Sequence, residues 1–446
     1  MNGKSKNIVI ADFYSKELNN YRNIRIYLPQ SYETELDKRY PVLYMHDGQN
    51  LFDPADSPFK TTWNVHKTVD KLANDGKMKA IIVVGIDNNA NRGSEYCHFM
   101  PEGRMEGRRG FRKCKISKEA RGILYERFII NSLKPYIDAH FRTLKDRDNT
   151  ALMGSSLGGL VTYFIGFRHP EIFSKLGILS PAFNWADFEK LNDVQKEPLK
   201  IWMDTGEGEA YYVENSRKVV NSLLEKGFVP EKDLAYFQVP GAIHNEDCWA
   251  KRLRMPLLFF FGNIGKPVSC SLTGRKRIGL KGMDVTVNPI VKYDSGFIMT
   301  DINGKFTIEN PDILEIEPNG RIIPKACGTT NVKYEKYGLM DNGTYEIINE
   351  LSETVKLELD IKVPSNTPTQ ERIFVNVGEI IEATKDKNGI YKCIITVPRD
   401  WGYHYNILMG DAHIRELDVN GKPVENIFQA TDNMKIQYTV EKWDFA

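Results

Sequence analysis

A serine set among glycines, Ser156, is the residue of this chain whose surroundings most clearly predict chemistry. It lies in Gly154-Ser155-Ser156-Leu157-Gly158, which matches the pattern G-x-S-x-G. The apolar run 150–153 predicts a strand before it, and residues 160–167 have helical spacing after it. A serine on a sharp strand-to-helix turn is a nucleophile elbow, in which small neighbours let the backbone close and leave the hydroxyl accessible. The sequence therefore predicts a nucleophile, and an ordinary glycine turn is the alternative.

A serine hydroxyl is a weak nucleophile at neutral pH and needs a base, which in turn needs a third group to orient it. In the hydrolase order of this triad, the acid and the histidine follow the serine, each just after a strand. Of the eight histidines, His244 lies downstream of Ser156 and directly after a predicted strand at 234–239. It is therefore the predicted base. The alternative is a loop histidine that bonds Glu246 or Asp247.

The acid of the triad should follow the next predicted strand upstream of the histidine, residues 199–204. We favour Glu209, because Gly206 and Gly208 let the backbone before it curl toward the histidine. The two carboxylates not chosen would be solvated loop residues, which is the usual place of acidic side chains. The three candidates are Asp204, Glu207 and Glu209.

The negative oxygen that forms during ester cleavage must be held by two backbone N–H groups. One is expected from Leu157, the residue after the nucleophile, and the other from the loop that follows the early apolar run 41–46. Gly48 permits a tight bend in that loop, so Gln49 is the expected second donor. The acidic residues of the loop do not have the spacing of a twelve-residue calcium loop, and no metal is expected there.

Two further features are candidates for the substrate pocket. Residues 99–118 are rich in glycine and in basic side chains, among them Arg104 and Arg108. As a flap over the pocket they would offer positive charge to an anionic substrate, whereas the alternative is a solvated surface loop, the usual place of charge runs. Trp185 is a candidate for the wall of the acyl or leaving-group pocket, with packing in the core as the alternative.

Strand-like and helix-like stretches alternate through residues 1–264. Continuous apolar runs such as 41–46 and 80–86 predict strands that are buried on both faces. Residues 126–140 and 215–226 have helical spacing. The alternation predicts an α/β domain with a doubly wound, mostly parallel sheet. In such sheets the active site lies at the carboxyl ends of the strands.

Seven stretches within residues 20–262 carry a family resemblance: RIYLPQSY, YPVLYMHDGQNLFD, IIVVGIDN, LKPYIDAHFRT, ALMGSSLGGL, FRHPEIF and LSPAFNW. They resemble the esterase family of α/β-hydrolases, which includes enterochelin-esterase-like, feruloyl-esterase-like and esterase-D-like enzymes. The resemblance implies Ser156 as nucleophile and His244 as base. The family's acid falls three residues after a glycine that matches Gly206, which implies Glu209. The family often has aspartate at that position.

From residue 265 onward the pattern changes to short strand-like runs separated by turns. Asn-Gly pairs between alternating runs are strong hairpin signals, so this part predicts all-β sandwiches. Four such pairs occur here: Asn303-Gly304, Asn319-Gly320, Asn342-Gly343 and Asn420-Gly421.

The all-β part resembles two kinds of module. Residues 265–349, through FTIENPDILEIEPNGRIIPKACGTTNVKY, resemble a bacterial immunoglobulin-like domain. Residues 350–446, through LELDIKVPSNTPTQERIFVNVG and YKCIITVPRDWGYHYNILMGDAHI, resemble a starch- or glycogen-binding sandwich. That family binds sugar with tryptophans soon after the glycines that match Gly378 and Gly410, and this chain has GEIIEA and GDAHI there. We therefore expect a degenerate module that packs or pairs two copies as a homodimer.

The totals exclude several classes of protein. Hydrophobic residues make up 41% and charged residues 27%, as in a soluble globular protein, and 446 residues suggest about three domains. A net charge of +1 indicates neither nucleic acid nor an anionic membrane as partner. The start of the chain lacks a signal-peptide core, which predicts a cytoplasmic protein, or a secreted one if a leader has been removed. Six scattered cysteines without a CxxC pair predict neither a disulfide framework nor a zinc site.

Together these residues predict a serine carboxylic-ester hydrolase that works through an acyl-enzyme and needs no cofactor. The appended β modules favour an acetyl or feruloyl ester of a carbohydrate as substrate. The alternatives within the chemistry are a siderophore of the enterochelin trilactone type and acyl transfer to a sugar. The alternative outside it is a scaffold or binding protein on an inactive hydrolase fold, which the complete Ser–Glu–His order disfavours.

Overall fold

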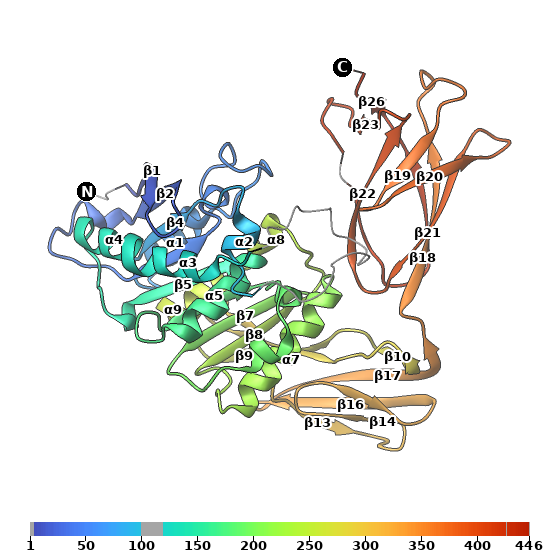
Figure 1. Cartoon of the computed structure of the whole chain (residues 1–446). Coiled ribbons are helices and arrows are strands. Elements are labelled where there is room, and N and C mark those ends of the chain that lie inside the picture. The colour runs from blue at the N-terminus through green and yellow to red at the C-terminus, as the bar shows by residue number, and fades with distance from the viewer. Residues whose placement is uncertain (1–3, 100–118, 425, 446) are drawn as a thin grey trace.

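The computed structural model describes residues 4–99, 119–424 and 426–445 (Figure 1). Its largest element is an eleven-stranded mixed sheet with the order β1-β2-β4-β3-β5-β6-β7-β8-β12-β11-β9. Neighbours from β4 to β8 run parallel, whereas β1 and β2 are antiparallel additions at one edge. The bounds of its first eight strands are β1 (Lys6–Ser15), β2 (Asn20–Leu28), β3 (Val42–His46), β4 (Ile82–Ile86), β5 (Thr150–Ser155), β6 (Lys175–Leu179), β7 (Lys200–Gly206) and β8 (Leu234–Val239).

Alternate side chains of the buried strands face two separate hydrophobic cores, as the pleat of a strand requires. On β5, Leu152 belongs to one core and Met153 to the other, and on β4, Val84 and Val83 divide in the same way. The first core is completed by α3 (Gly122–Arg127), α5 (Leu157–Arg168) and α7 (Ala210–Glu225). The second is completed by α1 (Val65–Asn74), α8 (Glu246–Arg252) and α9 (Arg254–Phe261). The predicted doubly wound α/β fold is thus confirmed.

Two predicted helices differ in their details. The stretch 126–140 contains the end of α3, a π-helical segment η3 (Phe128–Leu133) and α4 (Lys134–His140). Pro135 lies in the first turn of α4 and has no N–H to continue the regular hydrogen bonds, which accounts for the change of helix type. α7 begins at Ala210 instead of residue 215, so Glu209 is its N-cap residue.

The central sheet continues past residue 264, where the sequence predicts the first domain boundary. Strand β12 (Ile298–Thr300) pairs with β8 through Thr300 and Tyr236, and β11 (Asn288–Tyr293) and β9 (Pro267–Thr273) follow in antiparallel order. The next part of the chain is therefore hydrogen-bonded to the α/β sheet. Its own four-stranded sheet has the order β10-β17-β16-β13, with bounds β10 (Arg277–Gly282), β17 (Leu339–Leu351), β16 (Gly328–Lys336) and β13 (Lys305–Ile308).

The C-terminal strands form a further sheet system with a core of its own. Figure 1 shows it in orange and red, above β10 and β17 and beside the α/β part, with β22 on the side that faces the α/β part. Its order is β25-β18-β21-β20-β19-β22-β23-β26, and β24 pairs with β22. The bounds are β18 (Thr354–Lys362), β19 (Ile373–Asn376), β20 (Ile380–Lys385), β21 (Tyr391–Pro398), β22 (Gly402–Met409), β23 (Ile414–Leu417), β24 (Asn426–Gln429), β25 (Met434–Thr439) and β26 (Lys442–Trp443). We call residues 354–443 the C-terminal sandwich.

The Asn-Gly pairs do not all form hairpins. Asn319-Gly320 connects the antiparallel strands β14 (Leu314–Ile316) and β15 (Ile322–Pro324), as predicted. Asn342-Gly343 instead lies inside β17, so that prediction is wrong. The turn between β16 and β17 is taken by Tyr337-Gly338, whose φ angles of 54° and 76° are those of a two-residue hairpin turn.

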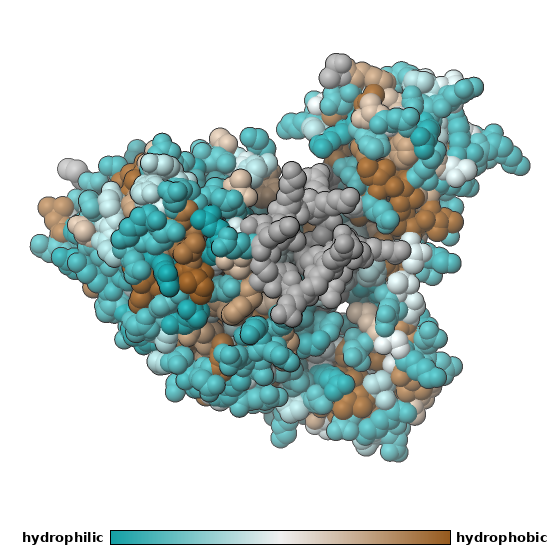
Figure 2. All heavy atoms as spheres, viewed as in Figure 1, coloured by the Kyte–Doolittle hydropathy of each residue, from teal (hydrophilic) through white to brown (hydrophobic). Residues whose placement is uncertain are grey.

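Hydrophilic residues cover most of the face in Figure 2, and apolar residues are visible in separate areas on the α/β part, on the lower β part and on the C-terminal sandwich. Within the described ranges, no helix has both the length and the apolar character to cross a membrane. The same ranges bring together no group of three metal-binding side chains.

Candidate active site

Ser156 lies at the point where β5 turns into α5, and its backbone is strained. Its φ and ψ angles are 58° and −123°, a conformation that a residue with a side chain rarely adopts. The turn is so tight that a Cβ at Gly154 would lie 2.7 Å from the carbonyl group of Gly158. Only glycine fits there, which is why the flanking glycines are needed. The sharp turn places the half-buried Ser156 at the carboxyl edge of the sheet, beyond the end of the strand.

The loop after β8 brings His244 to Glu209, which follows β7. A hydrogen bond of 2.9 Å joins His244 Nδ1 to Glu209 Oε2. The Glu209 side chain is 1% exposed and that of His244 is 30% exposed, so the carboxylate is shielded while the ring reaches solvent. With Nδ1 bound to the acid, Nε2 is the ring nitrogen left to exchange a proton with a substrate or nucleophile.

The other two carboxylates predicted as alternatives face different partners. Asp204 is fully buried and accepts hydrogen bonds from Arg252 Nε at 2.8 Å and Trp202 Nε1 at 2.7 Å. Burial raises the pKa of Asp204 to about 6, although Arg252 opposes the shift. Glu207 accepts a bond from the Gly241 N–H at 3.1 Å. The structure therefore gives Glu209 alone of the three candidates a hydrogen bond to His244.

A small polar network fixes the other oxygen of Glu209. Oε1 accepts from the Ser180 hydroxyl at 2.9 Å and from the Gly206 N–H at 3.0 Å. Ser180 Oγ itself accepts from Trp249 Nε1 at 2.9 Å and from Arg252 Nη2 at 2.6 Å. Because two donors occupy its lone pairs, the serine must direct its own proton to the carboxylate.

Burial and charge act in opposite directions on Glu209. Burial by itself would raise the pKa of Glu209, but His244, Arg252 and the Ser180 hydroxyl stabilise the carboxylate and hold that pKa below its ordinary value. Its place at the N-cap of α7 adds the favourable helix dipole. The residue is consequently ionised at neutral pH, as a group that orients a histidine must be.

Tyr212, in the first turn of α7, connects the two halves of the site. The Tyr212 ring lies 4.5 Å from the His244 ring, centroid to centroid, and the Tyr212 hydroxyl lies near Ser156. Burial raises the pKa of the Tyr212 hydroxyl. Ser156 and His244 therefore lie around one shared tyrosine. Spacing in the sequence gives no signal for this residue, because aromatic side chains near a helix start usually pack in the core.

The loop predicted to supply the second oxyanion donor packs against the start of α5. A Cβ at Gly158 would lie 3.4 Å from Asp47 Oδ2, and a Cβ at Gly48 would lie 2.6 Å from Asp87 Oδ1. Asp47 adopts a left-handed φ of 57° and begins the short turn η2 (Gly48–Asn50). Gln49 thus lies in the tight turn that follows β3. The Leu157 N–H is in the first turn of α5 and has no partner within the helix.

Arg92 holds this loop in place. In α2 (Arg92–Glu95), its guanidinium donates to the two carboxylate oxygens of Asp47 at 2.7 and 2.8 Å. The Asp47 N–H donates to the Tyr96 hydroxyl at 3.2 Å. Burial would raise the pKa of Asp47, but the charge of Arg92 lowers it below its usual value. The ion pair therefore fixes a charged carboxylate at the base of the turn.

The predicted pocket residues have different outcomes. Arg104 and Arg108 lie outside the described residues. Trp185, in η5 (Phe183–Trp185), is 7% exposed and belongs to the first hydrophobic core, which agrees with the packing alternative.

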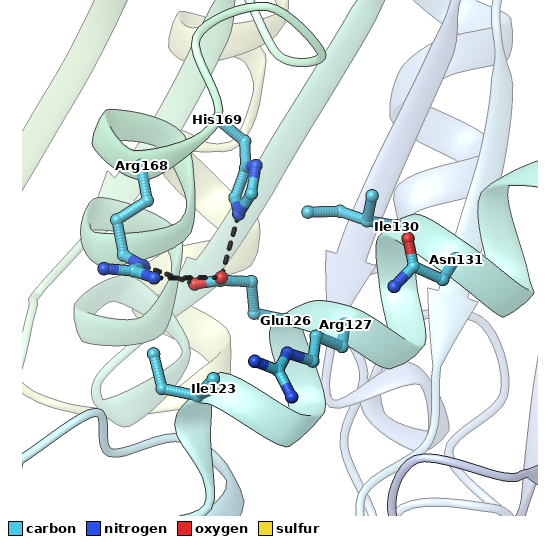
Figure 3. Close-up of a pocket in the computed structure, with 7 residues that line it drawn as sticks. All are labelled: Ile123, Glu126, Arg127, Ile130, Asn131, Arg168 and His169. Atoms are coloured by element: carbon cyan, nitrogen blue, oxygen red, sulfur yellow. Dashed lines mark hydrogen bonds and ion pairs between the residues drawn. The ribbon is translucent and has the colours of Figure 1, made fainter.

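A cavity of about 310 Å³ between α3, η3 and the end of α5 is lined by none of the triad candidates (Figure 3). Glu126 points into it and is already bonded by Arg168 and His169, at 2.8 Å in each case. A carboxylate satisfied in this way has no vacancy for a ligand. We therefore take the cavity as a surface feature of the scaffold, separate from the candidate active site.

A doubly wound sheet with a strained serine at the start of a helix defines the chain as an α/β-hydrolase. The family model described as "Putative esterase" matches residues 15–255, more than half of the chain. The chain belongs to this esterase family.

The chain is similar to two curated proteins over its α/β part. It is 24% identical over 252 residues to "Uncharacterized protein YbbA" of Bacillus subtilis, which covers 54% of this chain and 93% of that protein. It is 29% identical over 236 residues to an endo-1,4-beta-xylanase/feruloyl esterase of Xylanibacter ruminicola, which covers 50% of this chain and 28% of that protein. The second relative is therefore a much longer protein.

The chain is also similar, at low identity, to two solved structures. A ferulic acid esterase has 21% identity and a TM-score of 0.43, and covers 58% of this chain and 99% of that one. The enterobactin esterase of Shigella flexneri has 20% identity and a TM-score of 0.42, and covers 57% of this chain and 58% of that one.

Proposed function

We propose that the chain is a serine carboxylic-ester hydrolase with Ser156, His244 and Glu209 as its catalytic triad. The observations that carry the proposal are the strained elbow serine at the end of β5 and, at the same edge of the parallel strands, a histidine whose Nδ1 is bonded to a buried carboxylate. This arrangement supplies a nucleophile, a base and an orienting acid. Membership in the esterase family supports the same reaction class.

In the acylation half of the reaction, Ser156 Oγ attacks the ester carbonyl carbon while His244 Nε2 takes the hydroxyl proton. The N–H groups of Leu157 and Gln49 stabilise the negative oxygen of the tetrahedral intermediate. When the intermediate collapses, the bond from carbon to the alcohol oxygen breaks, and His244 returns the proton to the leaving alcohol. Glu209 stabilises the imidazolium throughout and keeps its own charge.

In the second half, water takes the place of the alcohol. His244 removes a proton from the water, whose oxygen attacks the acyl carbon, and the serine oxygen leaves with that proton. The products are a carboxylic acid and the free enzyme. Every proton in this cycle is carried by the triad, so no metal or organic cofactor enters.

The substrate that we propose is an acetyl or feruloyl ester of a carbohydrate. Support comes from the relative of Xylanibacter ruminicola, whose name pairs a xylanase with a feruloyl esterase, and from the large β region attached to the hydrolase part. The alternative substrate is a siderophore trilactone, and the alternative reaction is acyl transfer to a sugar.

The chemistry is tested by hydrolysis of p-nitrophenyl acetate with wild type, Ser156→Ala and Glu209→Gln. We expect kcat to fall about 10⁶-fold in the serine variant and about 10⁴-fold in the glutamine variant, as for triads elsewhere. A fluorophosphonate probe should label wild type and leave Ser156→Ala unlabelled. Equal rates for wild type and Ser156→Ala, with no labelling of either, would favour an inactive scaffold.

The substrate class is tested by a panel of acetylated xylo-oligosaccharides, feruloylated arabino-oligosaccharides and a trilactone siderophore, read as released acid. The proposal expects the highest kcat/KM on one of the two carbohydrate esters. A higher value on the trilactone, or ester appearing on an added sugar acceptor instead of free acid, contradicts it.

A further inference from the structure

The C-terminal sandwich touches the loop that carries Glu209. The N–H of Gly402, the first residue of β22, donates to the carbonyl oxygen of Gly208 at 2.6 Å. Trp401 and Glu209 form an antiparallel bridge at the same point. A residue more than 190 positions along the chain is thus paired, backbone to backbone, with the proposed catalytic acid.

Aromatic side chains continue the contact into the sandwich. The rings of Tyr211 and Trp401 lie 6.2 Å apart, centroid to centroid. Trp401 is stacked at 6.3 Å on Tyr403, which is stacked at 5.2 Å on the buried Phe428. The row of rings therefore runs from the first turns of α7 to the core of the C-terminal sandwich.

The fit between the two parts is close. A Cβ at Gly402 would lie 2.2 Å from Cγ2 of Ile243, the buried residue before His244. A Cβ at Gly208 would lie 2.4 Å from Nε2 of Gln429. The sandwich consequently packs against both loops of the acid–base pair at distances that leave no room for one extra methyl group at Gly402.

A second anchor holds the sandwich at this place. Arg275, between β9 and β10, donates to Asp400 and to the carbonyl oxygen of Thr431. Arg399 donates to Asp432 at 2.8 Å, so the two turns of the sandwich that meet the rest of the chain are also tied to each other. These contacts fix the turn that presents Trp401 and Gly402.

We propose that the C-terminal sandwich is a positioning element for the acid–base pair, with Trp401 and Gly402 as positioning residues. The inference rests on the proposed function, because it assigns the orientation of Glu209 and His244 to contacts from outside the hydrolase part. Loops after strands of an α/β sheet are its most mobile elements, and a misplacement of about 1 Å can cost about 100-fold in rate. The backbone pairing of Trp401 and Gly402 with the loop that carries Glu209 limits that movement. The expected role of the module in packing becomes, in this proposal, a part of catalysis.

The test is Gly402→Ala in the full chain, with kcat and KM measured on p-nitrophenyl acetate. The backbone of Gly402 is not in the left-handed region, so the alanine strains the contact with Ile243 and not its own dihedrals. We expect kcat to fall about 10- to 100-fold with KM within about 2-fold, because the small ester is bound by the hydrolase part alone. Ile243→Ala removes the clashing methyl group, so the double variant should recover most of the lost kcat.

The matched control is Trp443→Phe, which alters a buried tryptophan of the sandwich in β26, away from the acid loop. It should leave kcat unchanged. Full kcat in Gly402→Ala, an equal loss in Trp443→Phe, or a double variant no faster than Gly402→Ala would overturn the inference. Ser156→Ala separates the two failures. If that variant is inert while Gly402→Ala is fully active, only the positioning role is wrong, whereas an active Ser156→Ala removes the triad itself.

Discussion

Glu209 illustrates how single residues around a carboxylate define its role. One oxygen serves His244 and the other is held by Ser180 and Gly206, so the side chain has one orientation. Trp249 and Arg252 in turn orient the Ser180 hydroxyl. An acid that could rotate would spend part of its time away from the histidine, and the network prevents this.

Ser180→Ala should therefore lower kcat while leaving KM nearly unchanged. The variant removes one donor from Glu209 and leaves Trp249 Nε1 and Arg252 Nη2 without the Ser180 oxygen as acceptor. We expect an effect of about 1–2 kcal/mol, or about 10-fold in kcat. Steady-state kinetics on p-nitrophenyl acetate measure it. The control is Ser222→Ala. Ser222 lies in the C-terminal half of α7, where its hydroxyl donates to Asn192, and its loss should keep the wild-type kcat. Equal kcat in both variants would mean that Glu209 is oriented without Ser180.

At the scale of elements, one ion cluster joins three separate parts of the first core. Glu126, 3% exposed in α3, accepts from Arg168 at the end of α5 and is bonded to His98 and His169 at 2.9 and 2.8 Å. Burial would raise the pKa of Glu126, but these three partners hold it well below its ordinary value of 4.5. The cluster therefore stabilises the packing of α3 on α5 in a pH-dependent way.

Because the folded-state pKa of Glu126 is depressed, its contribution to stability is present above about pH 4.5 and is lost as the pH falls further. Glu126→Gln should thus lower the free energy of unfolding by about 2 kcal/mol at pH 7. The difference from wild type should shrink below pH 4.5. Urea unfolding at several pH values measures it.

Glu171→Gln is the matched control, since Glu171 is bonded to the other nitrogen of His169 and its side chain is 63% exposed. Its effect should stay within about 0.5 kcal/mol. A difference between Glu126→Gln and wild type that is the same at pH 7 and pH 4 would contradict the assigned charge state.

At the scale of the whole molecule, the hydrolase part and the β region form a connected structure. The central sheet takes up β9, β11 and β12, and the C-terminal sandwich meets the loops at the carboxyl edge of that sheet. Arg275 is the main polar link between the start of the β region and the sandwich, with its side chain 14% exposed. Burial would lower the pKa of Arg275, but Asp400 raises it above its ordinary value.

Arg275→Gln should weaken the attachment of the sandwich by about 1–2 kcal/mol, since Asp400 loses a partly buried charged partner. Unfolding in urea, followed by tryptophan fluorescence, should show a lower midpoint for the transition that involves Trp401. Arg277→Gln is the control, because its side chain is 61% exposed and its pair with Glu346 is at the surface. The same midpoint in the two variants would show that Arg275 does not hold the sandwich.

Local patterns in the sequence were sufficient to predict the fold class of the hydrolase part. The elbow depends on the dihedral angles that glycine allows, and the buried strands are read from the period of apolar residues. Both signals act over a few neighbouring positions of the chain. The same reasoning failed at Asn342-Gly343, where pairing along the long strand β17 outweighed the turn preference of the dipeptide. It also assigned residues 265–349 to a separate module, whereas β9, β11 and β12 pair within the central sheet. Membership in one sheet or another is decided by partners far away in the chain.

The sequence by itself therefore predicted the chemistry: Ser156 as nucleophile, His244 as base and one of three carboxylates as acid. Only the tertiary structure decided which carboxylate meets the base, that Ser180 and Tyr212 surround the pair, and that Trp401 and Gly402 lie against the acid loop. The physical reason is that hydrogen bonds and packing contacts act over a few ångströms of space. Separation along the chain carries no information on such distances once the chain has folded back on itself.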